Sequence, residues 1–554
     1  MFGVIFGNIR HEGAQHPRCR FPERFYFLKK ELGIVEESLP PVRCPLYDEW
    51  REKVRIESVS LIFASFYINN PASLFGHTFL KWNRQGSRGD DELLDFGLNF
   101  AANATTDNAI LYGIYGVFGG FPGVYTLFPY YFKVNEYNDW ENRDIWEYPL
   151  NLNQEEIERM VRHSWELGST HFNYYYFDEN CSYQILTLLE VARPSLNLSD
   201  YYILSVQPLD TVKVAVRQNK LLREKPRLRL SAFGRLRSRI EKLSEKERKL
   251  YFKLYPTYSL PPEDIPLESR IALIDTLMDD YFFRYYGEKE IDPAKKKNYE
   301  ILLKERSRLK IKRENQEPEE GEDPSLGHDS TTWRLSYLYH SQVQGFDVLF
   351  RPALRELVDP PFGYSPYAAI SMFALNLRFF PTERIYPYFE KLILAEVFSL
   401  SPMRAYYLKP SWGLLFSLES LQRRYQEDKF HDKVAFVGQL GAGASYGEKP
   451  FTLFLLPVIR SELSAAIAHF WDPSVGVLAG ILARIATRLS FLWQLSSRYY
   501  FRAKEKIFLE FLSQVNLALQ RNLALEASYH RAVARLKSPM LFQEEILFSL
   551  KIYR

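Results

Sequence analysis

Hydrophobic and polar positions change their spacing along this chain, and the changes separate segments of different structure. Between residues 54 and 210, short runs of apolar and β-branched residues come first, and apolar residues at helical spacing follow. The predicted strands are Val59–Ser65, His77–Trp82 and Leu93–Phe100, and the predicted helices are Asn151–Gly168 and Ser182–Val191. This succession indicates an α+β domain over residues 54–210.

Polar, helical patterns flank this domain on both sides. Residues 1–53 are polar and punctuated by prolines, which predicts an N-terminal helical cap. Residues 211–323 are rich in charge and contain the capping-box sequence Ser244-Glu245-Lys246-Glu247. They end in an acidic segment with Pro and Gly, so we expect a helical connector that finishes in a linker.

Residues 324–554 show short alternating segments separated by turns such as Asp359-Pro360-Pro361. About ten to twelve strands of this kind predict an antiparallel sheet, and we favour a closed β-barrel. Arg378, Arg423 and Arg498 recur among the strands and would suit a polar barrel interior. Whether such a barrel would span a membrane is left open by the sequence.

Composition narrows the class of protein. A hydrophobic content of 46% in 554 residues excludes a mainly disordered chain, and 16% aromatic residues fits strands, pockets and membrane interfaces. A formal net charge of +3 gives no reason to expect a nucleic-acid partner. Basic residues concentrate between Arg217 and Lys249, where they form either solvated helix faces or a contact with anionic lipid headgroups.

Residues 108–132 carry no charge but contain repeated Gly and Pro. These residues would interrupt a transmembrane helix, so we expect strands and glycine-rich loops with apolar walls. No transmembrane helix or signal peptide is evident, and for an exported protein we expect the true start to lie upstream.

Three cysteines occur, at positions 19, 44 and 181. A Cys19–Cys44 disulfide would staple the cap and leave Cys181 free, which implies an oxidising compartment. The alternative is three reduced thiols in a cytosolic protein.

Cys181 and His77 stand in positions suited to nucleophilic catalysis. Cys181 opens an apolar helix, where the helix dipole favours a thiolate and free backbone N–H groups at Asn180-Cys181-Ser182 could hold an oxyanion. His77 follows a glycine at a strand start and would serve as base and acid. Asn99, or alternatively Asp95, would orient its ring.

The order of the two residues indicates a permuted papain-like site, because the histidine precedes the cysteine. Taken singly, a cysteine at a helix start is more often a buried apolar residue, and a histidine on an apolar strand is usually packed in the core. The conjunction of both motifs in one domain favours the catalytic interpretation.

The chain resembles the periplasmic domain of Lnb-type lipoprotein N-acyltransferases over about residues 60 to 200. The segments that carry the resemblance are Ala64–Tyr67, Asn70–Leu80, Asn99–Ala102, Gly116–Gly123, Arg143–Tyr148 and Tyr176–Ser182. The cap and the strand-rich part resemble flanking domains of proteobacterial relatives. The resemblance implies a permuted NlpC-like thiol fold in which His77 and Cys181 match the catalytic pair.

The resemblance also implies a reaction. The cysteine would take an acyl chain from a phospholipid as a thioester and pass it to the α-amino group of a lipoprotein's N-terminal cysteine, without metal or cofactor. We therefore expect a phospholipid donor, a lipoprotein acceptor, a membrane surface and a location in the periplasm or cell envelope, associated with the outer membrane.

Two other functions remain open at this point. One is a cysteine amidase or peptidase that acts on peptidoglycan or another envelope amide, with water as the acceptor. The other is a non-enzymatic outer-membrane module that carries a degenerate thiol domain. The family members usually compared are membrane-anchored and lack the extra strand-rich domain, so the substrate is an expectation only.

Overall fold

The computed structural model describes residues 15–66, 75–106, 108–202, 205–218, 221–309, 311, 322–340, 343–365, 367–382, 386–420, 433–448, 450–465, 467, 469–502, 506–534 and 541–554. These residues form two compact units, one within residues 15–311 and one that begins at Glu322. Arg423 lies outside the described residues.

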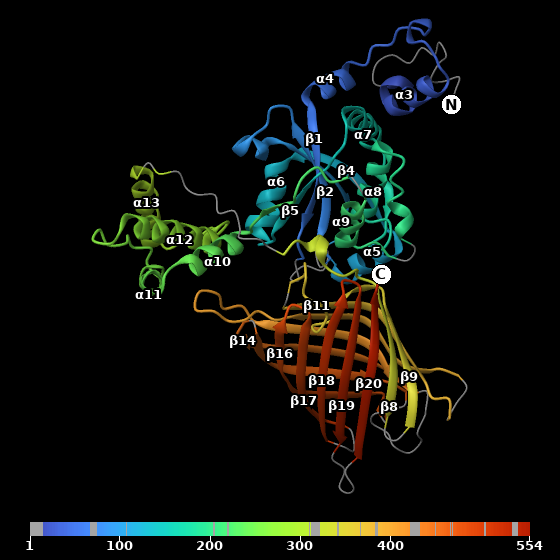
Figure 1. Cartoon of the computed structure of the whole chain (residues 1–554), viewed down its shortest axis with the longest axis vertical. Helices are drawn as coiled ribbons and strands as arrows, with labels where there is room; N and C mark the ends of the chain where they lie inside the picture. Colours follow the sequence, from blue (N-terminus) through green and yellow to red (C-terminus); the bar gives the residue numbers. More distant parts are fainter. Residues whose placement is uncertain are drawn as a thin grey trace. The chain divides into compact units, whose positions relative to one another are not determined.

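The first unit is built on one antiparallel sheet of seven strands in the order β6-β4-β3-β2-β1-β5-β7 (Figure 1). The strands are β1 (Ile56–Ala64), β2 (His77–Arg84), β3 (Phe96–Ala102), β4 (Phe121–Pro129), β5 (Ile145–Pro149), β6 (Phe172–Tyr174) and β7 (Arg227–Arg229). The three predicted strands correspond to β1, β2 and β3. Together with the helices below, this sheet confirms the predicted α+β class.

Helices cover the two faces of this sheet. On one side are α7 (Gln154–Leu167), α8 (Cys181–Ala192) and α9 (Pro208–Arg217), which contact the central strands. On the other side lie α6 (Tyr130–Val134) and the π-helix η5 (Asn135–Trp140). Tyr130 and Tyr137 from these elements pack with Ile62 and Phe79 of the sheet.

The expectation of strands and loops across residues 108–132 is wrong in its first part, because α5 (Ala109–Phe118) is a helix. The Asn108 side chain accepts from the Leu111 N–H, and Gly119 at φ +74° ends the helix, where the Gly120 N–H donates to the Tyr115 carbonyl. Glycine in a helix costs only about 1 kcal/mol, so two interior glycines do not prevent it. Strand β4 follows as expected.

The remaining helices lie in the cap, the connector and the loops. They are α2 (Pro17–Arg20), α3 (Pro22–Glu31), η2 (Glu36–Ser38), α4 (Pro45–Lys53), η4 (Gly89–Leu94), η6 (Ser199–Tyr201), α10 (Ala232–Lys242), α11 (Glu245–Leu254), α12 (Leu267–Tyr285), α13 (Pro293–Arg308) and η7 (Pro324–Leu326). The expected capping box is present at Ser244 and Glu247 of α11. Within the described part of the chain, no helix is both long and apolar enough to cross a membrane.

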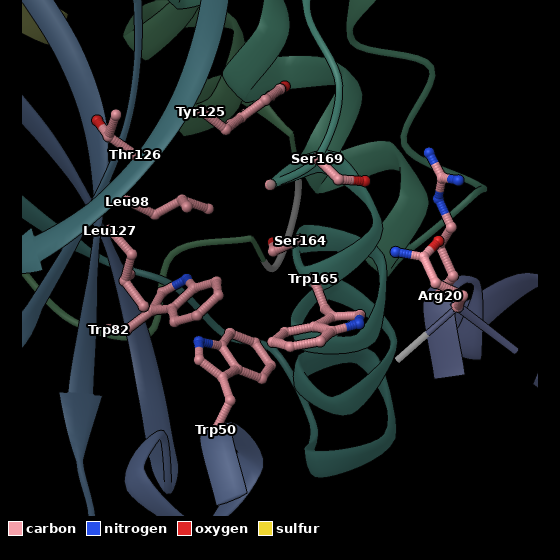
Figure 2. Close-up of a pocket in the computed structure, with 12 residues that line it drawn as sticks. Arg20, Trp50, Trp82, Leu98, Tyr125, Thr126, Leu127, Ser164, Trp165 and Ser169 are labelled. Atoms are coloured by element: carbon pink, nitrogen blue, oxygen red, sulfur yellow. The ribbon is translucent and has the colours of Figure 1, made fainter. Parts of the chain in front are cut away.

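A disulfide and a tryptophan hold the cap against the domain. Cys19 and Cys44 are joined, as expected from the cysteine count. The Trp165 indole on α7 donates to the Cys19 carbonyl at 2.8 Å, and its ring centroid lies 5.1 Å from that of Trp50 on α4 (Figure 2). Glu166 accepts from the Glu23 backbone N–H at 2.8 Å. The cap is therefore fixed at both ends of its disulfide loop.

The second unit is one antiparallel sheet that closes on itself. Its strands are β8 (Thr332–His340), β9 (Val343–Arg351), β10 (Ala353–Arg355), β11 (Ala368–Phe379), β12 (Tyr388–Ser399), β13 (Ser411–Ser420), β14 (Val434–Tyr446), β15 (Phe451–Leu463), β16 (Trp471–Ala486), β17 (Leu489–Tyr500), β18 (Ile507–Gln520), β19 (Leu523–Ala534) and β20 (Leu541–Tyr553). Each strand from β11 to β20 pairs with the next, β20 pairs with β8, and β9 pairs with both β8 and β11. The closed barrel that the alternating segments predicted is confirmed, with β10 as a short addition to β11.

Charged side chains fill the barrel interior in pairs. Arg351 donates to Asp359 at 2.7 Å, and the Lys551 ammonium lies 3.0 Å from the same carboxylate. Arg378 bonds Glu545 at 3.1 Å, and Arg498 pairs with Glu510. All of these groups but Glu510 are almost fully buried. Two of the arginines that the sequence analysis placed in a barrel interior therefore have acidic partners there.

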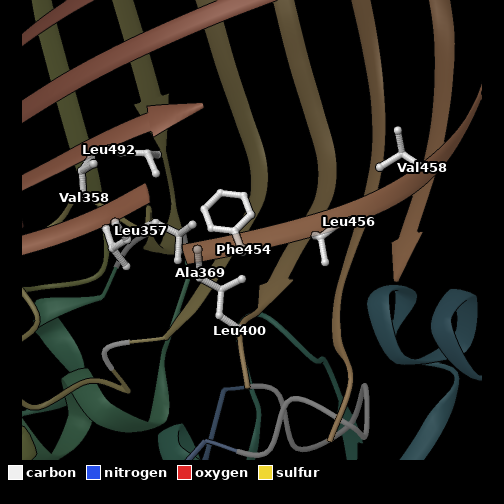
Figure 3. Close-up of a cluster of buried hydrophobic side chains, with 9 residues drawn as sticks. Leu357, Val358, Ala369, Leu400, Phe454, Leu456, Val458 and Leu492 are labelled. Atoms are coloured by element: carbon white, nitrogen blue, oxygen red, sulfur yellow. The ribbon is translucent and has the colours of Figure 1, made fainter. Parts of the chain in front are cut away.

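A segment that follows β10 crosses the interior and meets the far wall. Leu357 and Val358 on this segment pack with Phe454 and Leu456 of β15 in one apolar cluster (Figure 3). The cluster also contains Ala369, Leu400, Val458, Leu482 and Leu492. Because β9 and β20 bond Asp359 from the other side, this segment ties opposite walls of the barrel together.

Replacing Asp359 tests how far the barrel depends on this network. Asp359→Ala leaves the buried Arg351 and Lys551 with one carboxylate fewer, so we expect the free energy of unfolding to fall by about 3–5 kcal/mol. Urea unfolding of the full chain in detergent, followed by tryptophan fluorescence, measures it.

Glu544→Ala is the matched control, because Glu544 pairs with Arg531 at the exposed barrel surface and should contribute about 0–1 kcal/mol. Equal unfolding midpoints for the two variants would contradict the assigned role of the network.

Candidate functional site

Asn180 fixes the start of α8 and therefore the position of Cys181. Its side-chain oxygen accepts from the backbone N–H of Ser182 at 2.9 Å and of Tyr183 at 3.3 Å. Its amide nitrogen donates to the carbonyls of Tyr176 at 3.2 Å and Val206 at 2.7 Å. Cys181 thus stands at the first helical residue and is buried and free of any disulfide.

His77 begins β2 directly after a glycine in a left-handed conformation. Gly76 has φ +85°, and a Cβ there would lie 2.6 Å from the Phe63 ring. Any side chain at position 76 would be strained and would also clash. The turn that brings His77 to the end of the sheet therefore requires glycine. Residues 67–74, which carry the first part of this motif, lie outside the described residues.

Asn99 on β3 holds the His77 ring. The His77 Nε2 and Asn99 Oδ1 atoms are 2.5 Å apart. In the β2–β3 register Leu80 pairs with Leu98, so odd-numbered residues of both strands share one face of the sheet, which places His77 and Asn99 on the same face. An amide oxygen only accepts, so Nε2 carries the proton and Nδ1 keeps its lone pair.

The two motifs meet at Thr78, the residue after His77. The Thr78 backbone N–H lies close enough to the Cys181 sulfur to lower the pKa of the thiol. The Thr78 hydroxyl donates to Ser182 Oγ at 2.9 Å, and that oxygen lies 3.7 Å from Cys181 Sγ. The histidine and cysteine segments, far apart in sequence, are therefore adjacent in the fold.

Burial sets the protonation states of both groups. It raises the pKa of the Cys181 thiol above its ordinary value and outweighs the hydrogen bonds from Ser182 and Thr78 that lower it. The pKa of His77 is lowered to about 3, first by burial and then by the positive charges of Lys133 and Arg143. Both shifts favour a neutral thiol and a neutral imidazole at neutral pH, so they do not support the expected thiolate.

One of the N–H groups expected to hold an oxyanion already has an acceptor, because the Ser182 N–H donates to the Asn180 side chain. The Cys181 N–H lies close enough to the Tyr174 hydroxyl to affect the pKa of that hydroxyl. The side-chain N–H groups of Asn180 donate to two carbonyls and are therefore also occupied. Tyr174, on β6, was missed by the sequence analysis because a tyrosine seven residues before the cysteine carries no recognisable signal.

Asp95 is not the residue that orients His77. Its carboxylate accepts from the Arg84 backbone N–H at 3.0 Å and lies 3.6 Å from the Lys81 ammonium. Lys81 is four residues beyond His77 on the same strand, about 13 Å along it. Of the two alternatives, the structure pairs Asn99 with the ring.

A second group of residues around His77 was also missed. Tyr137 on η5 lies with its ring centroid 6.0 Å from that of His77. The Lys133 ammonium and the Arg143 guanidinium lie 5.0 Å and 4.6 Å from the Tyr137 ring. They surround the imidazole with positive charge, which favours its neutral form. Within the described ranges, no cluster of three or more His, Cys, Asp or Glu is arranged to hold a metal ion.

The thiol should alkylate slowly at neutral pH. Since burial raises the pKa of Cys181, we expect its reaction with iodoacetamide to accelerate only above the ordinary thiol range of about pH 8.5. Intact mass spectrometry across pH measures this rate for one residue, because the other two cysteines are paired. Urea-denatured protein is the control, and a lower midpoint in the folded state would contradict the assignment.

The bond to Asn99 should select one tautomer of His77. In wild type we expect the Nε2–H form and no protonation until the pH approaches about 3. Asn99→Ala should mix the two tautomers, which ¹⁵N NMR of labelled histidine distinguishes. Asn83→Ala is the control, because Asn83 bonds Ser58 and Ser60 on the same sheet. Unchanged tautomers in Asn99→Ala would refute the orienting role.

Residues 46–218 match the model of the Lnb N-terminal periplasmic domain, and residues 321–553 match a domain of unknown function (DUF7840). No curated protein matches the chain.

Several solved barrels align with the chain. They include KdgM porin in complex with disordered oligogalacturonate (6% identity, 40% of this chain and 99% of that chain, TM-score 0.24). A bacterial polysaccharide outer membrane secretin aligns at 7% identity, over 41% of this chain and 99% of that one, with TM-score 0.24. The outer membrane protein Omp33 of Acinetobacter baumannii aligns at 9% identity, over 41% and 99%, with TM-score 0.21. Residues 46–218 of this chain are therefore similar to the Lnb N-terminal periplasmic domain family.

Proposed function

We propose that the chain is a cell-envelope thiol acyltransferase. Cys181 takes an acyl chain from a phospholipid as a thioester and passes it to an amine, the N-terminal cysteine of a lipoprotein. The observation that carries the proposal is the convergence at Thr78 of a free thiol and a histidine oriented by Asn99. The match of residues 46–218 to the model of the Lnb N-terminal periplasmic domain supports this reaction class over others.

In the first step the Cys181 proton moves to Nδ1 of His77 as sulfur attacks the ester carbonyl. The carbon–oxygen bond of the ester then breaks, and the lysophospholipid leaves with the proton from His77. Because both groups are neutral at rest, proton transfer accompanies attack rather than preceding it. An acyl thioester remains on Cys181.

In the second step the acceptor amine attacks the thioester. Its proton passes to His77 and then to the departing sulfur, so the free thiol is restored and an amide is formed. In both steps the carbonyl oxygen gains negative charge. The Cys181 N–H and the neighbouring Tyr174 hydroxyl are the donors we assign to it.

An exposed apolar helix face lies beside this site. Leu111, Ile114 and Phe118 of α5 are exposed, the last at 76% of its surface. The Gly116 carbonyl of the same helix accepts from the Tyr176 N–H at 2.7 Å, and Tyr176 leads into the cysteine segment. A lipid surface is a suitable environment for such a face next to the nucleophile.

We assign the barrel to an outer membrane. On β8 the exposed residues are Trp333, Leu335, Tyr337 and Tyr339, and they alternate with interior residues such as Ser336 and Leu338. An apolar exterior around a paired, charged interior is the pattern of membrane barrels. This placement supports a location in the cell envelope, which the periplasmic description of the Lnb domain also favours.

Transfer is tested with the full chain in phospholipid nanodiscs and a synthetic diacylglyceryl-cysteine peptide. We expect an N-acylated peptide and one lysophospholipid per turnover, with loss of at least about 1000-fold in Cys181→Ala, the order seen when a catalytic nucleophile is removed. Mass spectrometry measures both products.

Controls in the same assay separate the alternatives. Lys249→Ala, which changes an exposed residue of α11, should leave the rate unchanged. Free fatty acid without acylated peptide would indicate a lipid hydrolase. Cleavage of muropeptides alone would indicate an envelope amidase. No reaction with any substrate would favour the non-enzymatic binding module. Each of these three results would refute acyl transfer.

A further inference from the structure

A pocket that the catalytic proposal does not use lies beside α7. Its volume is about 460 Å³, within the range of about 300–1,000 Å³ typical of small-molecule sites. Trp50 of the cap, Trp82 of β2 and Trp165 of α7 line it, with Leu98, Tyr125 and Leu127 from the sheet. Arg20 and Ser169 also line it.

The pocket lies apart from the nucleophile. Trp82 is five residues beyond His77 on β2, about 16 Å along the strand. Trp82 and Leu98 also point to the face of the sheet opposite to that of His77 and Asn99, because side chains alternate along a strand. Neither His77 nor Cys181 lines the pocket.

One polar atom in this pocket has no partner. Trp82 is fully buried, and its indole Nε1 makes no hydrogen bond. Figure 2 shows this nitrogen on the side of the ring that faces the pocket. The neighbouring Trp165 differs, since its indole donates to the Cys19 carbonyl. Buried indole N–H groups usually find an acceptor, and an unsatisfied one costs about 1–3 kcal/mol.

The walls restrict which acceptor can reach this N–H. They are mainly aromatic and aliphatic, so the ligand must be largely apolar. The nearby Ser164 hydroxyl already donates to the Met160 carbonyl at 2.8 Å. Arg20 lines the pocket from an exposed position and has no carboxylate partner within the described part of the chain. Its guanidinium is therefore available to an anionic group of the ligand that lies at the surface of the pocket.

From these features we infer that the pocket binds one long acyl chain of an anionic or zwitterionic lipid, whose ester carbonyl accepts from Trp82 Nε1. The acyl chain lies among the three tryptophans and Leu127, and the headgroup lies toward Arg20. The same chemistry is present in a phospholipid and in the lipid part of a lipoprotein.

The cap disulfide holds one wall of this pocket. Cys19 precedes Arg20 and provides the carbonyl for Trp165, while Cys44 precedes the first residue of α4, which carries Trp50. The disulfide therefore fixes the two cap segments that line the pocket relative to one another. Cys19→Ser with Cys44→Ser should weaken lipid binding without any change at Cys181.

The test uses the full chain in nanodiscs and two probes of equal chain length. Palmitoyl lysophosphatidylcholine has an ester carbonyl, and hexadecylphosphocholine has none. Trp82→Phe keeps an aromatic ring but removes the N–H, so we expect affinity for the ester probe to fall about 2- to 12-fold and affinity for the other probe to stay unchanged. Quenching of tryptophan fluorescence by chain-brominated versions measures both.

A second variant and a mapping experiment distinguish loss of lipid binding from misfolding of the protein. Leu127→Trp should fill the pocket and abolish binding of both probes while circular dichroism stays unchanged. A diazirine placed in the palmitoyl chain should crosslink to α4, α7 or β4, as mapped by peptide mass spectrometry. Crosslinks confined to the barrel, or equal loss of both probes in Trp82→Phe, would overturn the inference.

Competition experiments identify which lipid supplies the acyl chain that occupies the pocket. Displacement of the probe by a diacyl phospholipid assigns the pocket to that lipid, and displacement only by a diacylglyceryl-cysteine peptide assigns it to the lipoprotein. Displacement by neither would refute the proposal. Because this binding is measured also in Cys181→Ala, its result does not depend on the proposed acyl transfer.

Discussion

The start of α8 is fixed by a set of hydrogen bonds on which the whole site depends. Asn180 bonds the first helical turn and the neighbouring loop carbonyls, and the Thr78 hydroxyl on the sheet donates to Ser182. Since Thr78 is the residue after His77, the same contact positions the proposed base and the proposed nucleophile. The capped N-terminus of α8 thus contacts the start of β2 and brings together two segments that are distant in the sequence.

Burial creates the main electrostatic constraint of this site. It raises the pKa of the thiol and lowers that of the imidazole, so an ion pair is not the resting state. A buried neutral pair avoids the cost of two desolvated charges and becomes reactive when a substrate carbonyl supplies a place for negative charge. A neutral thiol is also less prone to oxidation, which suits the oxidising surroundings that the Cys19–Cys44 disulfide implies.

The sequence predicted those parts of the structure that local patterns determine. Helix α8 follows from an apolar run after Asn180, the barrel from alternation in segments such as Trp333–Tyr339, and Asn99 from its position on the strand beside His77. The sequence analysis missed what depends on tertiary contacts. Tyr174 reaches the site through sheet pairing, and desolvation of Cys181 outweighs the helix dipole only once the domain is packed around it. Helix α5 was missed because counting glycines overestimates the free-energy cost of glycine within an apolar helix.

The central claim is that Cys181 becomes acylated with the help of His77. The most direct measurement is the intact mass of the full chain after incubation with a phospholipid of one defined acyl chain and no amine. The account predicts a mass increase of one acyl group on Cys181 that neutral hydroxylamine removes and that His77→Ala lacks. An unmodified Cys181 in wild type, under conditions where lysophospholipid is released, would contradict it.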